Sequence, residues 1–232
     1  MIVVVGPAAY SPTPGGIGRA AGLAPEIAAA AAAAGSAVEL VAKIGEDGAG
    51  EELLLALARA GVGHLAVLRD PARPTPLALP RSEGPDEDEE PPLPALIAEA
   101  EAAAAAVRPP GGNGQGFPPG PLLEAADLSL GLRYIRDYGV VVAVEPLADG
   151  GAAVVAEAAA FGDAALVVVA PPGATVPPAY ARATVFEAPE EDPDGAFAGV
   201  VGRYAAALDQ GVAPAEAFRA ATGEGGWEPA AG

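Results

Sequence analysis

The sequence predicts an α/β protein built as a three-layer α/β/α sandwich around a mainly parallel sheet. Continuous runs of β-branched residues, such as "IVVVG" at 2–6 and "VVVAVEP" at 140–146, are typical of strands that are buried on both faces. Between such runs lie longer segments rich in Ala and Leu that carry helix-capping residues. This alternation is that of β-α-β units, in which consecutive strands are parallel.

The first half of the chain alternates in this way as far as residue 69. After the strand at 2–6, Pro25 and Gly35 are suited to begin and to end a helix, because Pro is favoured at the first helical position and Gly just beyond the last. The next elements are expected in the order strand, amphipathic helix and strand, at Ala37–Lys43, Gly50–Gly61 and His64–Arg69.

The middle of the chain has a different composition. Residues Pro80–Pro94 are acidic and rich in Pro, which predicts a solvated linker, and Ala95–Val107 is expected to be a helix. The segment Arg108–Pro121 holds several Gly, but it does not follow a strand and lacks the Lys-Ser/Thr of a P-loop, so it is expected to be a surface loop.

The second half returns to alternation. A helix is expected at Leu122–Tyr138, ended by Gly139 and contributing to the core Leu123, Leu128, Leu130, Tyr134 and Ile135. Strands are expected at 140–146, 165–172 and 183–189, and helices at 151–161, 195–209 and 214–222. We therefore expect one α/β domain over residues 1–222 and a loose tail at 223–232.

Composition excludes several classes of function. The net charge is −19, with eleven Arg and one Lys, which disfavours binding to nucleic acids and anionic membranes. The chain has no Cys and one His, so thiolate or histidine metal sites and a Ser-His-Asp triad are not expected. No basic leader and no apolar run of about 18 residues is seen, and we expect a cytoplasmic protein.

The segment "EIAAAAAAAGSAVELVAKIGEDGAGEELLLALARAG" at 26–61 resembles the N-terminal half of the ribokinase-like (PfkB) carbohydrate kinases. Ala28, Gly35 and Gly45 keep the spacing of that family's pattern of a small residue and two glycines, and residues 195–222 resemble its closing helices. The resemblance implies the ribokinase-like version of the fold. It also implies ATP and Mg²⁺ as cofactors, and phosphoryl transfer to a sugar or nucleoside hydroxyl.

In this family a Gly-Ala-Gly-Asp turn precedes the penultimate helix. The resemblance implies that its amides hold the phosphoryl group and that its Asp is the general base. Asp194 takes the place of that Asp if Ala198-Gly199 is aligned with the family's Ala-Gly, and Gly195 takes it if Phe197 is aligned with the family's Phe. From the residues alone, the favoured interpretation of Asp194 is a helix N-cap, because Asp before an apolar run is a common cap.

Other site residues follow from positions near the expected strand ends or from the resemblance itself. Candidate substrate contacts are Tyr10, Glu26 and Lys43, and candidate nucleotide contacts are Gly173 and Gly195, with no metal ligand assigned. Two of these have structural alternatives: Glu26 as a first-turn acid that complements the helix dipole, and Lys43 as the polar end of a strand. Glu145 and Asp149 are either functional carboxylates at a strand end or solvated loop acids.

The sequence also departs from the family pattern at the expected site. Under the first alignment, Glu191, Asp192 and Pro193 replace the amide cradle, and Glu26 replaces a substrate-contacting Asn. The Thr-x-Gly of the nucleotide loop and the Asn-x-x-Glu motif are missing, and the lid strands are expected to be reduced or absent. Two functions therefore stay open: an impaired carbohydrate kinase, or a non-catalytic protein that binds a small molecule or another protein. We expect a monomer or a non-standard dimer, because the lid strands form the family's usual dimer surface.

Overall fold

The computed structural model describes residues 1–13, 18–78, 120–192 and 194–223. Its centre is a six-stranded sheet in the order β5-β4-β1-β6-β7-β8, and every neighbouring pair is parallel. The strands are β1 (Ile2–Val5), β4 (Val38–Gly45), β5 (Val62–Asp70), β6 (Val140–Val144), β7 (Ala165–Ala170) and β8 (Thr184–Glu187). The mainly parallel sheet expected from the sequence is confirmed.

The two central strands explain why the β-branched runs are continuous. Every residue of β1 and β6 is buried, and Ile2 lies opposite Val38 on one side and Val140 on the other. Successive side chains of a strand point to opposite faces. Ile2 and Val4 enter the core on one face, while Val3 and Val5 enter the core on the other, so no position in β1 can be polar.

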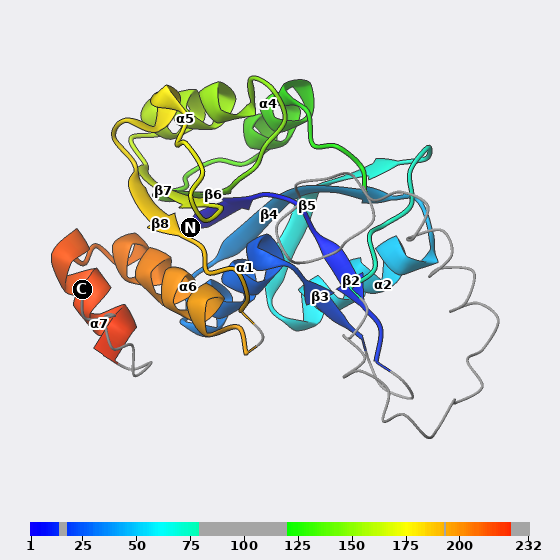
Figure 1. Ribbon diagram of the computed structural model, residues 1–232, viewed down its shortest axis with the longest axis horizontal. Coiled ribbons are helices and arrows are strands. Elements are labelled where there is room, and N and C mark those ends of the chain that lie inside the picture. Colours follow the sequence, from blue (N-terminus) through cyan, green and yellow to red (C-terminus); the bar gives the residue numbers. More distant parts are fainter. Residues whose placement is uncertain (14–17, 79–119, 193, 224–232) are drawn as a thin grey trace.

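Helices cover both faces of the sheet and complete the three layers (Figure 1). One face carries α1 (Leu23–Ala33), α2 (Gly48–Arg59), α6 (Ala196–Asp209) and α7 (Pro214–Gly223). The other face carries α4 (Ala125–Tyr134) and α5 (Gly151–Phe161), with a short 3₁₀ turn at η1 (Pro178–Tyr180). No helix in the described part of the chain is long and apolar enough to cross a membrane.

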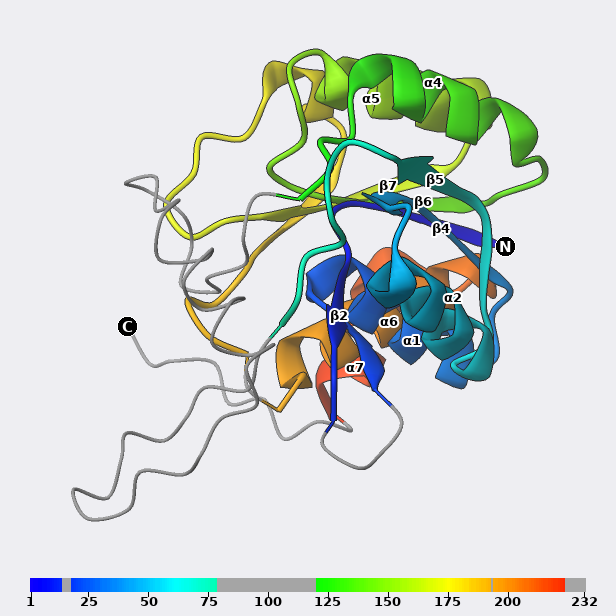
Figure 2. The ribbon, with the colours of Figure 1, turned by 90° about the vertical axis from the view of Figure 1, so that its right-hand side faces the viewer.

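A small second sheet lies between β1 and α1 in the chain. Strands β2 (Ala9–Ser11) and β3 (Arg19–Ala21) pair antiparallel beside α1 and α2 (Figures 1 and 2). Tyr10 also bonds to the segment after β5, donating its amide N–H to the Pro76 carbonyl and accepting from the Ala78 amide. The expectation of reduced lid strands is consistent with this three-residue pair, whereas their complete absence is wrong. Strands this short give no periodic signal in the sequence.

The boundaries of α1, α2 and α4 differ from the sequence prediction. Helix α1 begins at Leu23 rather than Pro25, and α2 begins at Gly48 because Asp47 caps it. Helix α4 spans ten residues instead of the seventeen expected. A capping box between Glu124 and Asp127 fixes its start.

Helix α4 also ends earlier than expected. Ile135 is already extended, so Gly139 does not end the helix. Of the expected core contacts, Leu123, Leu128 and Ile135 are buried, but Leu130 and Tyr134 are exposed. The predicted linker at 80–94, the helix at 95–107, nearly all of the loop at 108–121 and the tail from 224 lie outside the described residues.

Candidate functional site

In parallel α/β sheets, ligands bind outside the carboxyl ends of the strands, near the point where the strand order reverses. Here β1 lies at that point, since the chain moves outward from β1 to β4 and β5 and then returns to β6 on its other side. Helix α1 follows β1, and α6 follows the edge strand β8. A ligand at this edge of the sheet would therefore contact groups at the starts of α1 and α6 and at the ends of β6, β7 and β8.

The start of α6 is occupied by a carboxylate of the protein itself. Asp192 Oδ1 accepts the Phe197 amide at 3.0 Å, and Asp192 Oδ2 accepts the Ala198 amide at 2.9 Å. Gly195 is the N-cap residue, and its left-handed backbone with φ 66° forms the turn between Asp192 and the helix. Helix N-terminal amides are suited to hold an anion, and these two already hold one.

Asp194 does not take part in this cap. It is exposed, and no hydrogen bond to its carboxylate is found among the described residues, so the alternative in which Asp194 caps α6 is wrong. The capping carboxylate comes from four residues before the helix, and the usual rule examines the residue directly before it. Asp192 was visible in the sequence as an acid in the turn, but its role was not.

Glu26, in the first turn of α1, lies close enough to Asp192 at the start of α6 for the two charges to interact. Its side chain is 20% exposed, and its Oε1 lies 3.4 Å from Arg19 Nη1 of β3. Burial raises the pKa of the Glu26 carboxyl, the Arg19 charge and the Gly22 backbone lower it less, and the Asp192 charge raises it further. The structure thus brings Glu26 close to the start of α6 and places two carboxylates where a phosphate would approach.

This raised pKa makes stability depend on pH in a defined direction. In the folded chain, Glu26 stays protonated at pH values above its ordinary pKa of 4.5. The free energy of unfolding therefore falls as the pH rises from 4.5 through the pKa of the folded state. Glu26→Gln removes this titration. We expect the difference in stability, variant minus wild type, to increase between pH 4 and pH 7 in urea unfolding. A difference that is constant or decreases with pH would contradict the buried-carboxylate explanation.

Lys43 lies on the opposite side of the sheet from Glu26. Its Nζ is 2.9 Å from Asp127 Oδ2, and Asp127 belongs to α4, whereas Glu26 belongs to α1. Val41, two residues earlier in β4, packs in the core beneath α4 and α5, and Lys43 points to the same face of the sheet. The structure therefore does not bring the two proposed substrate contacts together, and the Lys43 ammonium is paired.

The remaining predicted site residues make contacts within the protein. The side chain of Tyr10 lies against Gly18, at the level of the β2–β3 pair. Gly173 has φ 67° in the turn after β7, and its amide donates to Glu187 Oε1 at 2.9 Å. As at α6, a backbone amide near the carboxyl end of a strand is bound to an internal carboxylate.

Glu145, at the end of the central strand β6, is held on both oxygens. It accepts the Tyr180 hydroxyl at 2.7 Å and the Leu147 amide at 2.7 Å. Burial and the nearby Glu145 carboxylate raise the pKa of the Tyr180 hydroxyl, which remains a donor. Glu145 is therefore not the solvated loop acid that was one alternative, and no sequence signal linked it to Tyr180, thirty-five positions away.

The resemblance implies ATP and Mg²⁺, and the arrangement of these residues does not fit them. The Phe197, Ala198 and Gly173 amides are bound to Asp192 and Glu187. Within the described ranges, no group of three or more His, Cys, Asp or Glu side chains is arranged to hold a metal ion. Carboxylates at these positions disfavour the approach of a polyphosphate to this edge of the sheet.

Solved structures nevertheless share the architecture. The crystal structure of Sa239 matches with a TM-score of 0.62 and 13% identity over 99% of this chain and 95% of its own. A PfkB protein from Polaromonas sp. JS666 matches with a TM-score of 0.58 and 16% identity over 97% and 93%. Arabidopsis thaliana ribokinase, solved with ribose and ATP, matches with a TM-score of 0.58 and 17% identity over 97% and 90%.

Comparison by sequence gives no closer assignment. No protein-family model matches the chain, and no curated protein does. The identities to the solved structures are low enough that they establish the fold and not the activity. The parallel six-stranded sheet, its two helical layers and these three matches together show that the chain has the ribokinase-like α/β fold.

Proposed function

We propose that this chain is a small-molecule-binding protein on a ribokinase-like scaffold and that it does not transfer phosphate efficiently. The observation that carries the proposal is the Asp192 carboxylate on the first-turn amides of α6. Function on a shared scaffold is decided by the site rather than by the fold. The scaffold supports ligand binding, and the occupied helix start argues against phosphoryl transfer.

The energetic argument has two parts. A phosphoryl group could bind the Phe197 and Ala198 amides only after displacing Asp192, which loses two charge-assisted hydrogen bonds. The displaced carboxylate and Glu26 would then repel the phosphate, each by about 1 kcal/mol at contact distance in water and more where solvent is excluded. Asp194 is exposed close by, but a base without an anion-holding cradle supplies a small part of the required rate enhancement.

Asp192→Ala tests this directly. Loss of the cap is expected to lower the free energy of unfolding by about 1 kcal/mol. The vacated amides should then bind an anion, so sulfate should stabilise Asp192→Ala more than wild type when it replaces chloride at constant ionic strength. Thermal unfolding measures both effects. Asp194→Ala is the matched control and should show neither, because Asp194 is exposed and outside the cap.

Nucleotide titrations of the wild type decide between the two functions. With millimolar ATP and Mg²⁺ we expect no saturable rise in melting temperature, since a ligand of the native state must raise it. We also expect no sugar-dependent formation of ADP. Saturable stabilisation by ATP, together with ADP formation that Asp194→Ala abolishes, would instead establish a carbohydrate kinase.

A further inference from the structure

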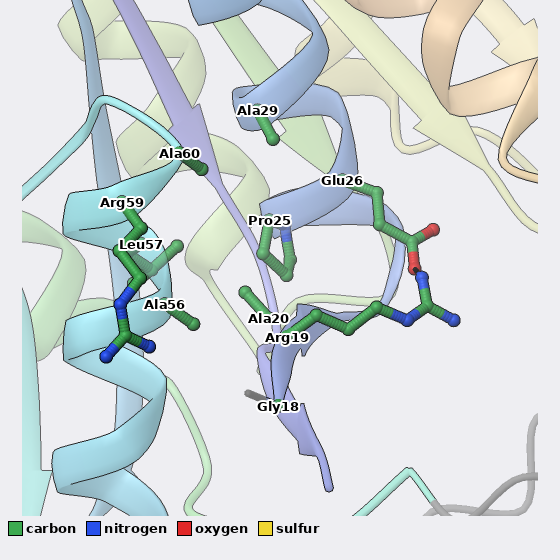
Figure 3. Close-up of a pocket in the computed structure, with 10 residues that line it drawn as sticks. All are labelled: Gly18, Arg19, Ala20, Pro25, Glu26, Ala29, Ala56, Leu57, Arg59 and Ala60. Carbon is green, nitrogen blue, oxygen red and sulfur yellow. Dashed lines mark hydrogen bonds and ion pairs between the residues drawn. The ribbon is translucent and has the colours of Figure 1, made fainter. Parts of the chain in front are cut away.

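A pocket of about 400 Å³ opens between α1, α2 and β3 (Figure 3). Its walls come from residues 18–20 of the β3 segment, from Pro25 and Ala29 of α1, and from Leu57 of α2 and Ala60 at the C-cap of that helix. Asp192 and the amides of α6 are not among the residues that line it.

Short side chains create this hollow. Ala29 faces Ala60 across it, and Pro25 faces Ala56, so small side chains border the space between the helices at these positions (Figure 3). Leu57 contributes to the wall and is fully buried. The volume lies within the range of small-molecule sites, which are mainly apolar with a few placed polar groups.

The polar groups of the pocket are two guanidinium groups and one carboxylate. Arg59 extends along the α2 side, and Arg19 lies on the β3 side and reaches toward Glu26 (Figure 3). In a chain with 31 acidic and 12 basic residues, two Arg side chains at one pocket are a local reversal of the overall charge. Among the described residues no carboxylate lies within ion-pair distance of Arg59, which leaves its guanidinium able to bind a ligand.

We infer that this pocket binds a small carboxylic acid with an apolar body, and that Arg59 binds the carboxylate. The inference rests on the proposed function and names its ligand class. An apolar body would cover Pro25, Ala29 and Leu57, and a planar guanidinium matches a carboxylate in a bidentate arrangement. Glu26 at the rim disfavours a second negative charge, which selects a monoanion over a phosphate ester.

Calorimetric titration with phenylacetate tests the inference, with phenylacetamide as the neutral isostere. We expect saturable binding of phenylacetate and at least tenfold weaker binding of phenylacetamide. Arg59→Gln should weaken phenylacetate binding at least tenfold, because it removes the charge-assisted hydrogen bonds. Ala29→Leu should abolish binding by filling the hollow. Arg133→Gln removes the same charge from α4, on the other face of the sheet, and should leave the affinity unchanged.

Three results would overturn the inference: no saturable binding of phenylacetate at millimolar concentration, equal binding of the amide, or full affinity in a folded Arg59→Gln variant. Melting curves of each variant establish that it is folded. The nucleotide titration described above is run on the same preparations. Absence of carboxylate binding without nucleotide stabilisation overturns this inference alone, whereas nucleotide stabilisation with phosphate transfer overturns the proposed function.

Discussion

Gly202→Ala is expected to lower the free energy of unfolding by about 2–3 kcal/mol, although it adds one methyl group and replaces a poor helix former with a good one. A Cβ at position 202 of α6 would lie 2.5 Å from the Ala30 Cβ, 2.8 Å from the Ile27 carbonyl oxygen and 2.9 Å from the Ala31 nitrogen. Two of these atoms belong to the backbone of α1 and cannot rotate away. The two helices must therefore separate along a buried interface.

Gly199→Ala on the same helix is the matched control. The nearest atom to a Cβ there is Arg203 Nη1 at 3.2 Å, the end of a flexible side chain. This variant should be neutral or more stable by up to about 1 kcal/mol through helix propensity. Urea unfolding of both variants measures the contrast. Equal stabilities would show that α1 and α6 are not packed as closely as the structure has them.

Asp47→Ala is expected to lower the free energy of unfolding by about 2–4 kcal/mol, since its carboxylate accepts three hydrogen bonds and joins the start of α2 to Thr75. Asp47 Oδ1 accepts the Gly50 amide at 2.8 Å, which caps α2, and the Thr75 hydroxyl at 2.7 Å. Oδ2 accepts the Thr75 amide at 2.8 Å, and Thr75 is 3% exposed. The variant loses a helix cap and leaves buried donors without an acceptor, and these two losses add.

The same carboxylate predicts the pH dependence of the effect. Burial raises the pKa of Asp47, but the hydrogen bonds from Thr75 and from the Gly50 amide outweigh it and hold the pKa below 3.8. The stabilisation is therefore present above pH 3.8 and is lost as the pH falls through the folded pKa. The stability difference between wild type and Asp47→Ala should shrink below that pH.

Asp70→Ala provides the comparison for Asp47→Ala. Asp70 accepts one exposed amide, that of Ala72 at 2.8 Å, so its loss should cost less than about 1 kcal/mol. Chemical unfolding at pH 7 and at pH 3 measures both variants. A cost for Asp47→Ala no larger than that for Asp70→Ala would contradict its joining role.

The local sequence was sufficient wherever one short segment determines its own structure. The valine runs of β1 and β6 predicted buried parallel strands, because a strand in the middle of such a sheet has no polar face. Gly35 and Gly61 predicted the ends of α1 and α2, and both have positive φ just after the helix. The resemblance of residues 26–61 also predicted the ribokinase-like fold, which the solved structures confirm.

Other features depended on partners far away in the chain. Helix α4 begins and ends at other residues than the sequence predicted, and Leu130 and Tyr134 are exposed although their spacing is helical. Strands β2 and β3 are too short for a periodic signal and form because each supplies the other with hydrogen-bond partners. The pairing of Glu145 with Tyr180 likewise required the folded chain.

The sequence by itself determined the layered α/β architecture and predicted acids in the turn before α6, where the resemblance implies an amide cradle. Only the tertiary structure decided what those acids do: Asp192 binds the α6 amides, and Glu26 lies beside Arg19 at the edge of a pocket that also includes Arg59. The physical reason is the separation along the chain of the groups that interact. Strand burial and helix ends depend on neighbouring residues. The hydrogen-bond partner of a helix amide and the pKa of a carboxyl depend on groups that only folding brings into contact.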